Sequence, residues 1–434
     1  MDSRLDVYLY GVPVAELERL APERYRMRYR DEWFDDPAAM PVSLSLPLGP
    51  RPHEGDVLTA FLDNLLPDNA EVRERWAVEA GLPTDEPFFL LAEYGEDVAG
   101  AIQFARPGID PNRAGSRAPV SETQVADRIA EIRRDDSLWR SRESETGYFS
   151  LGGAQGKFSL GNIGEGWYEP SGVHPTTHIF KPRVQGLSDG ELIEYLTMTA
   201  ASFAGLPTAE VEIGEFAGEH ALVVRRFDRV SGADGSIIRL HQEDLAQSLG
   251  RTRLQKYESR GGPGYREILR MLGEHVPEGR RIRARARFVQ ALVFSWMMLN
   301  TDAHAKNYSV FIGPDGVDLA PLYDVSSLIP YLGREGDDQR ALGAALHRTK
   351  LSMRIAADYE AGQQSWFEWK AVAREAGLDR EDLTDWARGV AEGMPELIAA
   401  LAATLPSHLQ TDTVARFVEL LPIRSGQIMR AVDE

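Results

Sequence analysis

Alternating apolar and polar residues mark the first part of the chain as rich in strands. Asp6–Tyr10 is strand-like, and Pro41–Leu48 alternates apolar with polar positions, so both predict half-buried β-strands. Residues 56–80 carry helical periodicity, which we expect to be broken near Pro67. Residues 106–119 are rich in Pro, Gly and Arg and lack apolar periodicity, which indicates a loop or linker.

The pattern of residues 147–229 predicts strands around a single helix. The helix is expected over Asp189–Ala204, because Gly205 and Pro207 follow it in the order typical of a helix end. The predicted strands are 148–151, 157–160, 177–181, 211–214 and 221–227. A glycine-rich turn separates the first two strands, so the predicted order is β, turn, β, β, helix, β, β.

Helical periodicity prevails beyond Gln242. The long amphipathic stretch Arg281–Leu299 leads into the polar segment Asn300–Tyr308, and strands are predicted after it over 309–313 and 318–323. The chain therefore places a polar loop between a long helix and a pair of strands.

The last part of the chain, from Tyr359 onward, is again helical in pattern. We expect Pro395 and Pro406 to break it, since proline lacks the backbone N–H that a helix interior needs. The arginine-rich stretch 280–287 is interpreted as a solvated helix face, as charge runs usually are.

The composition narrows the class of protein. The 434 residues include no cysteine, which excludes disulfides, thiolate metal sites and cysteine nucleophiles. No apolar run reaches the roughly 18 residues of a membrane span, and Met1–Tyr10 lacks the apolar core of a secretory signal, so we expect a cytoplasmic protein with no membrane contact. The formal charge of −19 argues against a general electrostatic grip on nucleic acid.

The polar segment after the long helix contains the most informative spacing. Asp302 and Asn307 stand in a D-x-x-x-x-N pattern. In protein kinases one loop with this spacing presents an Asp that accepts the substrate hydroxyl proton and an Asn that binds magnesium. A capped loop is the alternative interpretation, because Asp and Asn are ordinary turn residues.

A second metal-binding carboxylate is expected on or after the following strands. Asp324, in the sequence PLYD, fits this expectation. Carboxylate and amide oxygens are the hard ligands that Mg²⁺ prefers. Asp302, Asn307 and Asp324 together therefore predict a phosphotransfer site that uses ATP and Mg²⁺.

Upstream residues supply further candidates for binding ATP phosphates. Lys181 ends an apolar strand, and Glu194 lies on the next predicted helix, so the two could form the lysine–glutamate pair of a kinase. A solvated strand end and an exposed helix residue are the alternatives. His174 and His178 could instead suggest a zinc site, but Pro175 argues against a helical frame for them.

The segment SLGGAQGK, residues 150–157, predicts a glycine-rich turn between two strands. Its glycines would let backbone N–H groups approach phosphate oxygens closely. It is not a Walker A loop, because Leu151 and Phe158 stand where that motif needs Gly and Ser or Thr. A plain turn is the alternative interpretation.

Taken together, these motifs resemble the HipA family of bacterial serine/threonine kinase toxins. The segments that carry the resemblance are 61–69 (FLDNLLPDN), 149–157 (FSLGGAQGK), 175–181 (PTTHIFK), 226–229 (RFDR), 242–244 (QED), 256–258 (KYE) with 261–264 (GGPG), 302–307 (DAHAKN) and 321–324 (PLYD). The resemblance implies an α+β, two-lobed, protein-kinase-like fold with a β-rich N-terminal cap over 1–125, a nucleotide-binding lobe over 126–235 and a helical lobe over 236–434.

The resemblance also implies roles for individual residues. Asp302 would be the catalytic base or the residue that orients the hydroxyl, Asn307 and Asp324 would hold Mg²⁺, and Ser150 would be an autophosphorylation site that switches the kinase off. The residues expected to bind ATP are Lys181, Glu194, the loop residues Gly152, Gly153, Ala154, Gln155 and Lys157, the backbone of a hinge at Arg225 and Phe227, and Gln242, His304 and Tyr323.

The implied partners are a HipB-like helix-turn-helix antitoxin, operator DNA held mainly by that antitoxin, and a protein substrate such as glutamyl-tRNA synthetase. Two alternatives stay open at this point. The chain could act as a scaffold that tightens an antitoxin on its operator, or it could phosphorylate a small molecule.

Overall fold

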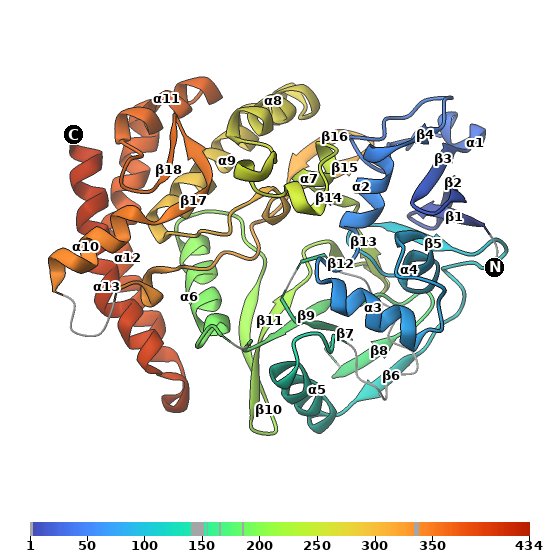
Figure 1. Cartoon of the computed structure of the whole chain (residues 1–434), viewed down its shortest axis with the longest axis horizontal. Helices are drawn as coiled ribbons and strands as arrows, with labels where there is room; N and C mark the ends of the chain where they lie inside the picture. Colours follow the sequence, from blue (N-terminus) through green and yellow to red (C-terminus); the bar gives the residue numbers. More distant parts are fainter. Residues whose placement is uncertain (1–2, 140–151, 154, 165, 185, 334–337) are drawn as a thin grey trace. The chain divides into compact units, whose positions relative to one another are not determined.

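The computed structural model describes residues 3–139, 152–153, 155–164, 166–184, 186–333 and 338–434. Helices and strands both contribute to it, which confirms the α+β class (Figure 1). The chain forms two compact units. The first consists of Met1–Gly186, Glu212–Gln255 and Val310–Asp315, and the second of Leu187–Val211, Lys256–Ser309 and Gly316–Glu434.

The first unit begins with an antiparallel sheet of strand order β4-β3-β2-β1-β5. Its strands are β1 (Arg4–Leu9), β2 (Val12–Ala21), β3 (Arg24–Tyr29), β4 (His53–Glu54) and β5 (Ile102–Ala105), and its helices are α1 (Asp31–Phe34), α2 (Asp56–Asn64), α3 (Ala70–Glu79) and α4 (Pro87–Tyr94). Leu5, Val7 and Leu9 alternate into the core, which confirms the first predicted strand. The helices on either side of Pro67 are confirmed as well.

A second sheet in the same unit has the order β10-β11-β9-β7-β8-β6. Its strands are β6 (Arg117–Val120), β7 (Phe158–Asn162), β8 (Trp167–Pro170), β9 (His178–Pro182), β10 (Val211–Phe216) and β11 (Glu219–Arg225). Helix α5 (Glu122–Arg134) packs its apolar side on this sheet through Val125 and Ile129, against the stacked rings of Phe158 and Phe180. The C-terminal boundary of the loop predicted over 106–119 is wrong, because β6 already begins at Arg117.

The remaining elements of the first unit are short. They are β12 (Arg229–Ser231), β13 (Ile237–Arg239), β14 (Gln242–Asp244), α7 (Leu245–Ser248) and the 3-10 turn η1 (Arg253–Gln255). Strand β15 (Ser309–Gly313) is the segment in which the chain passes from the second unit into the first.

The second unit is mainly helical. Its helices are α6 (Gly190–Phe203), α8 (Tyr265–His275), α9 (Glu278–Met298), α10 (Gln339–Arg348), α11 (Trp366–Ala376), α12 (Arg380–Thr404) and α13 (Asp412–Asp433). Its strands are β16 (Gly316–Leu319), β17 (Lys350–Ile355) and β18 (Asp358–Glu360), and its 3-10 turns are η2 (Glu258–Arg260), η3 (Ala305–Asn307), η4 (Ile329–Tyr331) and η5 (Ser407–Leu409). The helices α12 and α13 lie side by side (Figure 1).

The strand predicted over Pro41–Leu48 is wrong. Only an isolated bridge joins Ser43 to Leu46 there, where the chain turns back on itself. Side chains take the backbone donors that a ladder would use: the Val42 N–H donates to the Tyr29 hydroxyl, and the Leu44 N–H donates to the Glu243 carboxylate. Val42 and Leu46 are therefore buried here without a neighbouring strand, whereas Leu44 between them is only half-buried.

The break expected at Pro395 is also wrong, since α12 continues through it. Proline leaves the carbonyl four residues earlier, that of Ala391, without its helical donor. The Ser425 hydroxyl of α13 donates to that carbonyl at 2.8 Å. The neighbouring helix thus satisfies the acceptor, whereas Pro406 follows the end of α12 as predicted.

Candidate active site

The polar loop after α9 folds around the backbone carbonyl of Asp302. The Asn307 side-chain amide donates to it at 2.7 Å, and the His304 N–H donates to it at the same distance. These bonds bring the two ends of the D-x-x-x-x-N spacing together. The Asp302 side chain is 59% exposed, so its carboxylate is accessible, while Asn307 is buried.

Arg424 of helix α13 holds the end of α9, just before this loop. Its guanidinium donates to the backbone carbonyls of Trp296 and Met297 and lies over the Trp296 ring. The last carbonyls of a helix have no partner inside the helix and carry partial negative charge, which suits a cation. Burial lowers the pKa of Arg424 to about 9, which still leaves it charged near neutral pH.

The next two carbonyls are satisfied by the segment that follows Asp324. The Ser327 hydroxyl donates to the Met298 carbonyl at 2.6 Å, and the Leu328 N–H donates to the Leu299 carbonyl at 3.3 Å. Leu299 itself has a φ of +50° and ends the helix in the left-handed region. The start of the polar loop is therefore fixed from two sides.

Tyr323 fixes the other end of the loop. Its hydroxyl donates to the Lys306 carbonyl at 2.8 Å and contacts the Ser309 hydroxyl at 2.5 Å. Asp324 follows directly, with a φ of +53° that is unusual for a residue with a side chain. Such backbone strain is maintained only where the surrounding structure enforces it, and it clusters at functional sites.

The donor set of the second unit fits Mg²⁺. Because the Asn307 amide nitrogen donates to Asp302, its amide oxygen is left for a ligand, and Asp324 supplies a carboxylate. Among the described residues no cluster of three His, Cys, Asp or Glu side chains could hold a metal.

His304 lies against Asp302 without forming an ion pair with it. Burial lowers the pKa of His304 to about 4, so the imidazole is neutral near pH 7. Its Nε2 approaches the Asp302 carboxylate at 3.6 Å. Glu194, the other predicted residue of this unit, is buried on α6.

The first unit contains most of the candidates for binding the nucleotide, whereas Glu194, His304 and Tyr323 belong to the second unit. Lys181 is buried on β9, opposite Leu222 of β11. The Lys157 ammonium donates to the Gly152 carbonyl at 3.0 Å and lies over the Trp139 ring. The Gly153 carbonyl accepts from the Asp68 N–H at 2.8 Å, which ties the glycine-rich turn to the loop between α2 and α3.

The other candidates in this unit lie at strand ends. Arg225 ends β11 and is exposed, Phe227 packs on Phe311, and Gln242 begins β14. Gln155 is half-buried, whereas Ser150 and Ala154 lie outside the described residues. The structure therefore places these candidates within their own units. That the candidates of both units bind one ATP molecule stays a prediction.

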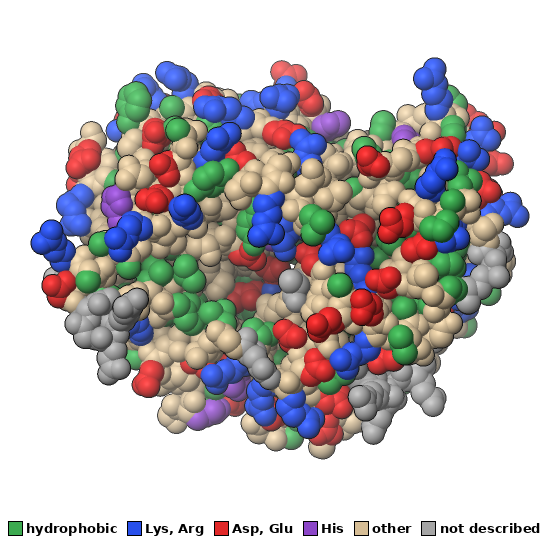
Figure 2. All heavy atoms as spheres, viewed as in Figure 1, with side chains coloured by type: hydrophobic (Ala, Val, Ile, Leu, Met, Phe, Trp, Pro, Cys, Tyr) green, Lys and Arg blue, Asp and Glu red, His purple; other side chains and the backbone are tan. Residues whose placement is uncertain are grey.

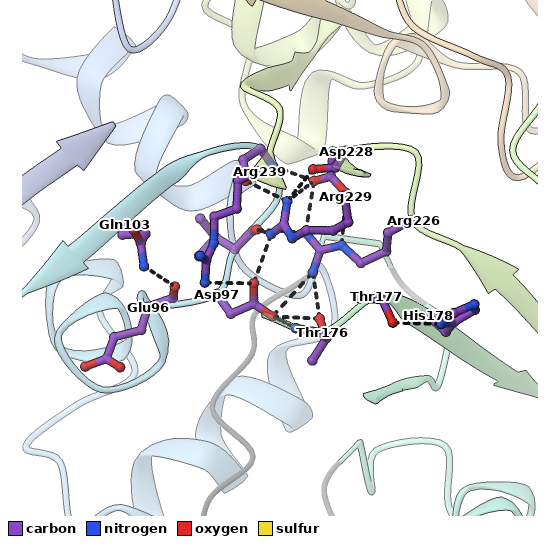
Figure 3. Close-up of polar contacts among 12 residues, drawn as sticks. Glu96, Asp97, Gln103, Thr176, Thr177, His178, Arg226, Asp228, Arg229 and Arg239 are labelled. Carbon is purple, nitrogen blue, oxygen red and sulfur yellow. Dashed lines mark hydrogen bonds and ion pairs between the residues drawn. The ribbon is translucent and has the colours of Figure 1, made fainter. Parts of the chain in front are cut away.

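A buried cluster of charges beside the predicted hinge was not anticipated from the sequence. Asp97 accepts from the Thr176 backbone and hydroxyl and from Arg229, while Asp228 accepts from Arg226 and from the Gly100 N–H (Figure 3). Arg239 completes the set. All the charged members are less than 9% exposed.

Ion pairing keeps this cluster charged. Burial alone would raise the pKa of Asp97, but Arg226, Arg229 and Arg239 outweigh it and hold that pKa below its usual range. Burial lowers the pKa of Arg239 to about 10. The cluster joins the loop after α4 to the residues on both sides of Phe227 and to the start of β9, the strand of Lys181.

The sequence indicates only some of the segments that form this cluster. The motif RFDR at 226–229 is visible in the sequence, but Asp97 lies more than a hundred positions earlier, next to Glu96, and no motif there distinguishes it from its acidic neighbours. Gly100 shows how closely the segments approach, because a Cβ there would lie 2.7 Å from the Gln242 carbonyl oxygen.

These features define a two-unit α+β protein with a kinase-type loop. Residues 149–398 match the HipA-like C-terminal domain, and residues 5–105 match the HipA N-terminal domain. The chain belongs to the HipA family of kinases.

Individual relatives agree with this assignment. The chain is 31% identical to the putative kinase Y4mE of Sinorhizobium fredii, over 85% of this chain and 86% of that protein. It is 28% identical to the serine/threonine-protein kinase toxin HipA of Shewanella oneidensis, over 99% of this chain and 97% of that protein. The solved Shewanella oneidensis complex of HipA, HipB and operator DNA contains a chain that matches with a TM-score of 0.81 and 25% identity, covering 99% of this chain and 98% of that one.

No helix in the described part of the chain is long and apolar enough to cross a bilayer. On the face shown in Figure 2, acidic and basic side chains are interspersed rather than gathered by sign.

Proposed function

We propose that this chain is a cytoplasmic serine/threonine protein kinase that transfers the γ-phosphate of ATP to a protein hydroxyl and serves as the toxin of a toxin–antitoxin pair. The observation that supports this most directly is the loop in which Asn307 holds the Asp302 carbonyl beside an exposed Asp302 carboxylate. One loop then presents a proton acceptor and a metal ligand to the same phosphate.

Each candidate has a role in this proposal. Asp302 accepts the proton of the attacking hydroxyl, and Asn307 with Asp324 would hold Mg²⁺, which would neutralise the charge that develops on the phosphates. Lys181 and the backbone of the glycine-rich turn hold the phosphates. Glu194 orients Lys181, and the hinge at Arg225 and Phe227 receives the base.

Self-inactivation would act through the glycine-rich turn. We propose Ser150 as the phosphorylated residue. A phosphoserine carries nearly two negative charges. Placed beside a site for ATP phosphates, it would repel them and seek other donors.

The proposed partner is a HipB-like antitoxin. The Shewanella relative was solved together with HipB and operator DNA. With a formal charge of −19, this chain is poorly suited to grip DNA by itself, so we propose that the antitoxin makes most of the DNA contacts. A scaffold role on the operator is compatible with kinase activity, and it predicts that Asp302→Asn still improves operator binding by the antitoxin.

The test of the kinase proposal is phosphate transfer from γ-labelled ATP with Mg²⁺, to the chain itself and to proteins of a bacterial lysate. Wild type should label itself and lysate proteins, an aminoacyl-tRNA synthetase being the first class to examine. Asp302→Asn should label neither. The exposed Asp385 of the same unit gives the matched control Asp385→Asn, which should behave as wild type. Equal labelling by wild type and Asp302→Asn would overturn the proposal, and label on sugars alone would favour a small-molecule kinase.

A further inference from the structure

The segment 256–258, which leads into the turn η2, is held firmly beside the polar loop. The Lys256 carbonyl accepts from the Ala305 N–H at 3.1 Å, within that loop. On the other side of the segment, the Glu258 carboxylate accepts from the Arg354 N–H at 2.8 Å and from its Nε at 3.0 Å, on β17. The residue between these two anchors is Tyr257, so its backbone has little freedom.

The turn that follows adds a third restraint. The N–H groups of Arg260 and Gly262 both donate to the Tyr257 carbonyl at 2.9 Å. The ring of Tyr257 meets the buried His304 ring edge-on, with centroids 4.8 Å apart and an interplanar angle of 87°. This geometry is a preferred one for aromatic pairs, and it fixes the direction in which the phenol points.

The Tyr257 hydroxyl donates a hydrogen bond to Oδ1 of Asp302. That oxygen is also the one approached by His304. Among the described residues no group donates to Oδ2 of Asp302, although the side chain is more than half exposed. The two oxygens of one carboxylate are therefore unequal: Tyr257 occupies the first, and the second is available to another donor.

We propose that Tyr257 is a positioning residue for phosphotransfer, a statement that rests on the proposed function of Asp302. By holding Oδ1 it selects one orientation of the carboxylate and presents Oδ2 to the substrate hydroxyl. In the transfer, the hydroxyl oxygen bonds to the γ-phosphorus as the bond to the β–γ bridging oxygen breaks. The substrate proton goes to Oδ2, and Tyr257 keeps its own proton.

The chain offers a matched pair of tyrosines to test this. Tyr265, in the same unit, also donates its hydroxyl to a carboxylate, that of Glu375 at 3.2 Å. Tyr257→Phe and Tyr265→Phe each delete one such hydroxyl and keep the ring. The experiment measures self-labelling of the full chain with γ-labelled ATP and Mg²⁺ over a range of ATP concentrations. It also measures Tm. Both are determined for the two tyrosine variants, for wild type and for Asp302→Asn.

The expected result is a loss confined to turnover. Tyr257→Phe should lower the maximal labelling rate by about tenfold or more, because a misplaced catalytic group loses on the order of a hundredfold. The ATP concentration at half-maximal rate should change less than about twofold, since the nucleotide contacts are untouched. Tyr265→Phe should keep the wild-type rate.

Other outcomes would overturn the proposal. A wild-type rate in Tyr257→Phe while Asp302→Asn is inactive would refute the role of Tyr257 and leave the kinase proposal standing. Equal rates in wild type and Asp302→Asn would refute both. A rate loss in Tyr257→Phe that is matched by Tyr265→Phe, with equal loss of Tm, would make the effect merely structural. Phosphate found on Tyr257 would make its hydroxyl a substrate.

Discussion

Two buried arginine sites maintain the geometry of this kinase by opposite means. In the first unit, Arg226 and Arg229 lie among carboxylates, and Asp97 and Asp228 neutralise most of their charge. In the second unit, Arg424 is equally buried, yet its hydrogen bonds among the described residues are to two backbone carbonyls and to the Gln427 side chain. One site depends on partner charges from distant segments, and the other depends on the end of one helix.

The two sites should therefore respond differently when one of their side chains is removed. Removing one partner from a buried ion cluster leaves an opposite charge uncompensated, which is strongly destabilising. Removing Arg424 leaves only neutral acceptors short of a donor, namely two backbone carbonyls and the Gln427 side chain, and relieves the cost of burying its charge. The same degree of burial should therefore give unequal effects on stability.

The largest effect is expected from Asp97→Ala. Arg229 and Thr176 would lose their acceptor inside the cluster. We expect the free energy of unfolding to fall by about 3–5 kcal/mol. Urea denaturation measures this, with Asp127→Ala, an exposed position on α5, as the control. A loss no larger than that of the control would show that the cluster does not support the unit.

A smaller effect is expected from Arg424→Met, which keeps most of the aliphatic volume. The carbonyls of Trp296 and Met297 lose the guanidinium as a donor, so the free energy of unfolding should fall by about 1–3 kcal/mol. Self-labelling should fall as well, since these carbonyls end the helix before Asn300. If Arg424→Met costs more stability than Asp97→Ala, the comparison between the two sites is wrong.

A pH-dependent effect is expected at Glu243, in the first unit. Burial raises the pKa of Glu243 to about 7 from an ordinary value of 4.5. The folded state therefore binds a proton that the unfolded chain releases, and the stability from this group, full below pH 4.5, is lost as pH rises through 7.

Glu243→Gln cannot ionise, so it should gain stability over wild type as pH rises. The gain should reach on the order of 1–3 kcal/mol at pH 8 and vanish near pH 4. Denaturation curves at both pH values check this, with the exposed Glu212→Gln as the control. A constant difference between wild type and Glu243→Gln at all pH values would contradict it.

The smallest effect is expected from Ser425→Ala. The carbonyl of Ala391 would lose the donor that compensates for Pro395. The free energy of unfolding should fall by about 1 kcal/mol. The double variant Ser425→Ala with Pro395→Ala restores the helical donor, so it should recover most of that loss. No recovery would mean that Ser425 acts through another contact.

The sequence predicted what depends on local pattern. Helix α6, strand β9 and the loop from Asn300 follow from periodicity, from Gly and Pro at helix ends and from a short motif. The strand at Pro41–Leu48 and the break at Pro395 failed for one reason. In both places a side chain from far along the chain, Glu243 or Ser425, satisfies a backbone group.

The candidate-site residues that the sequence did not predict escaped prediction for the same reason. Asp97, Tyr257 and Arg424 act on segments that are distant in sequence. Tyr257 stands in the KYE motif, but neither that motif nor the neighbours of Asp97 and Arg424 show which distant group each side chain contacts. Asp302 and Asn307 were found because their partnership spans only five positions. Local spacing therefore identified the groups expected to do the chemistry, and tertiary contacts supplied the groups that hold them in place.

The central claim is that Asp302 serves the transfer step and not the binding of ATP. The most direct measurement combines calorimetric titration with MgATP and the rate of self-labelling, for wild type and Asp302→Asn. The account predicts the same affinity for MgATP within about threefold, with labelling reduced by about a hundredfold or more. Undiminished labelling by Asp302→Asn would contradict it.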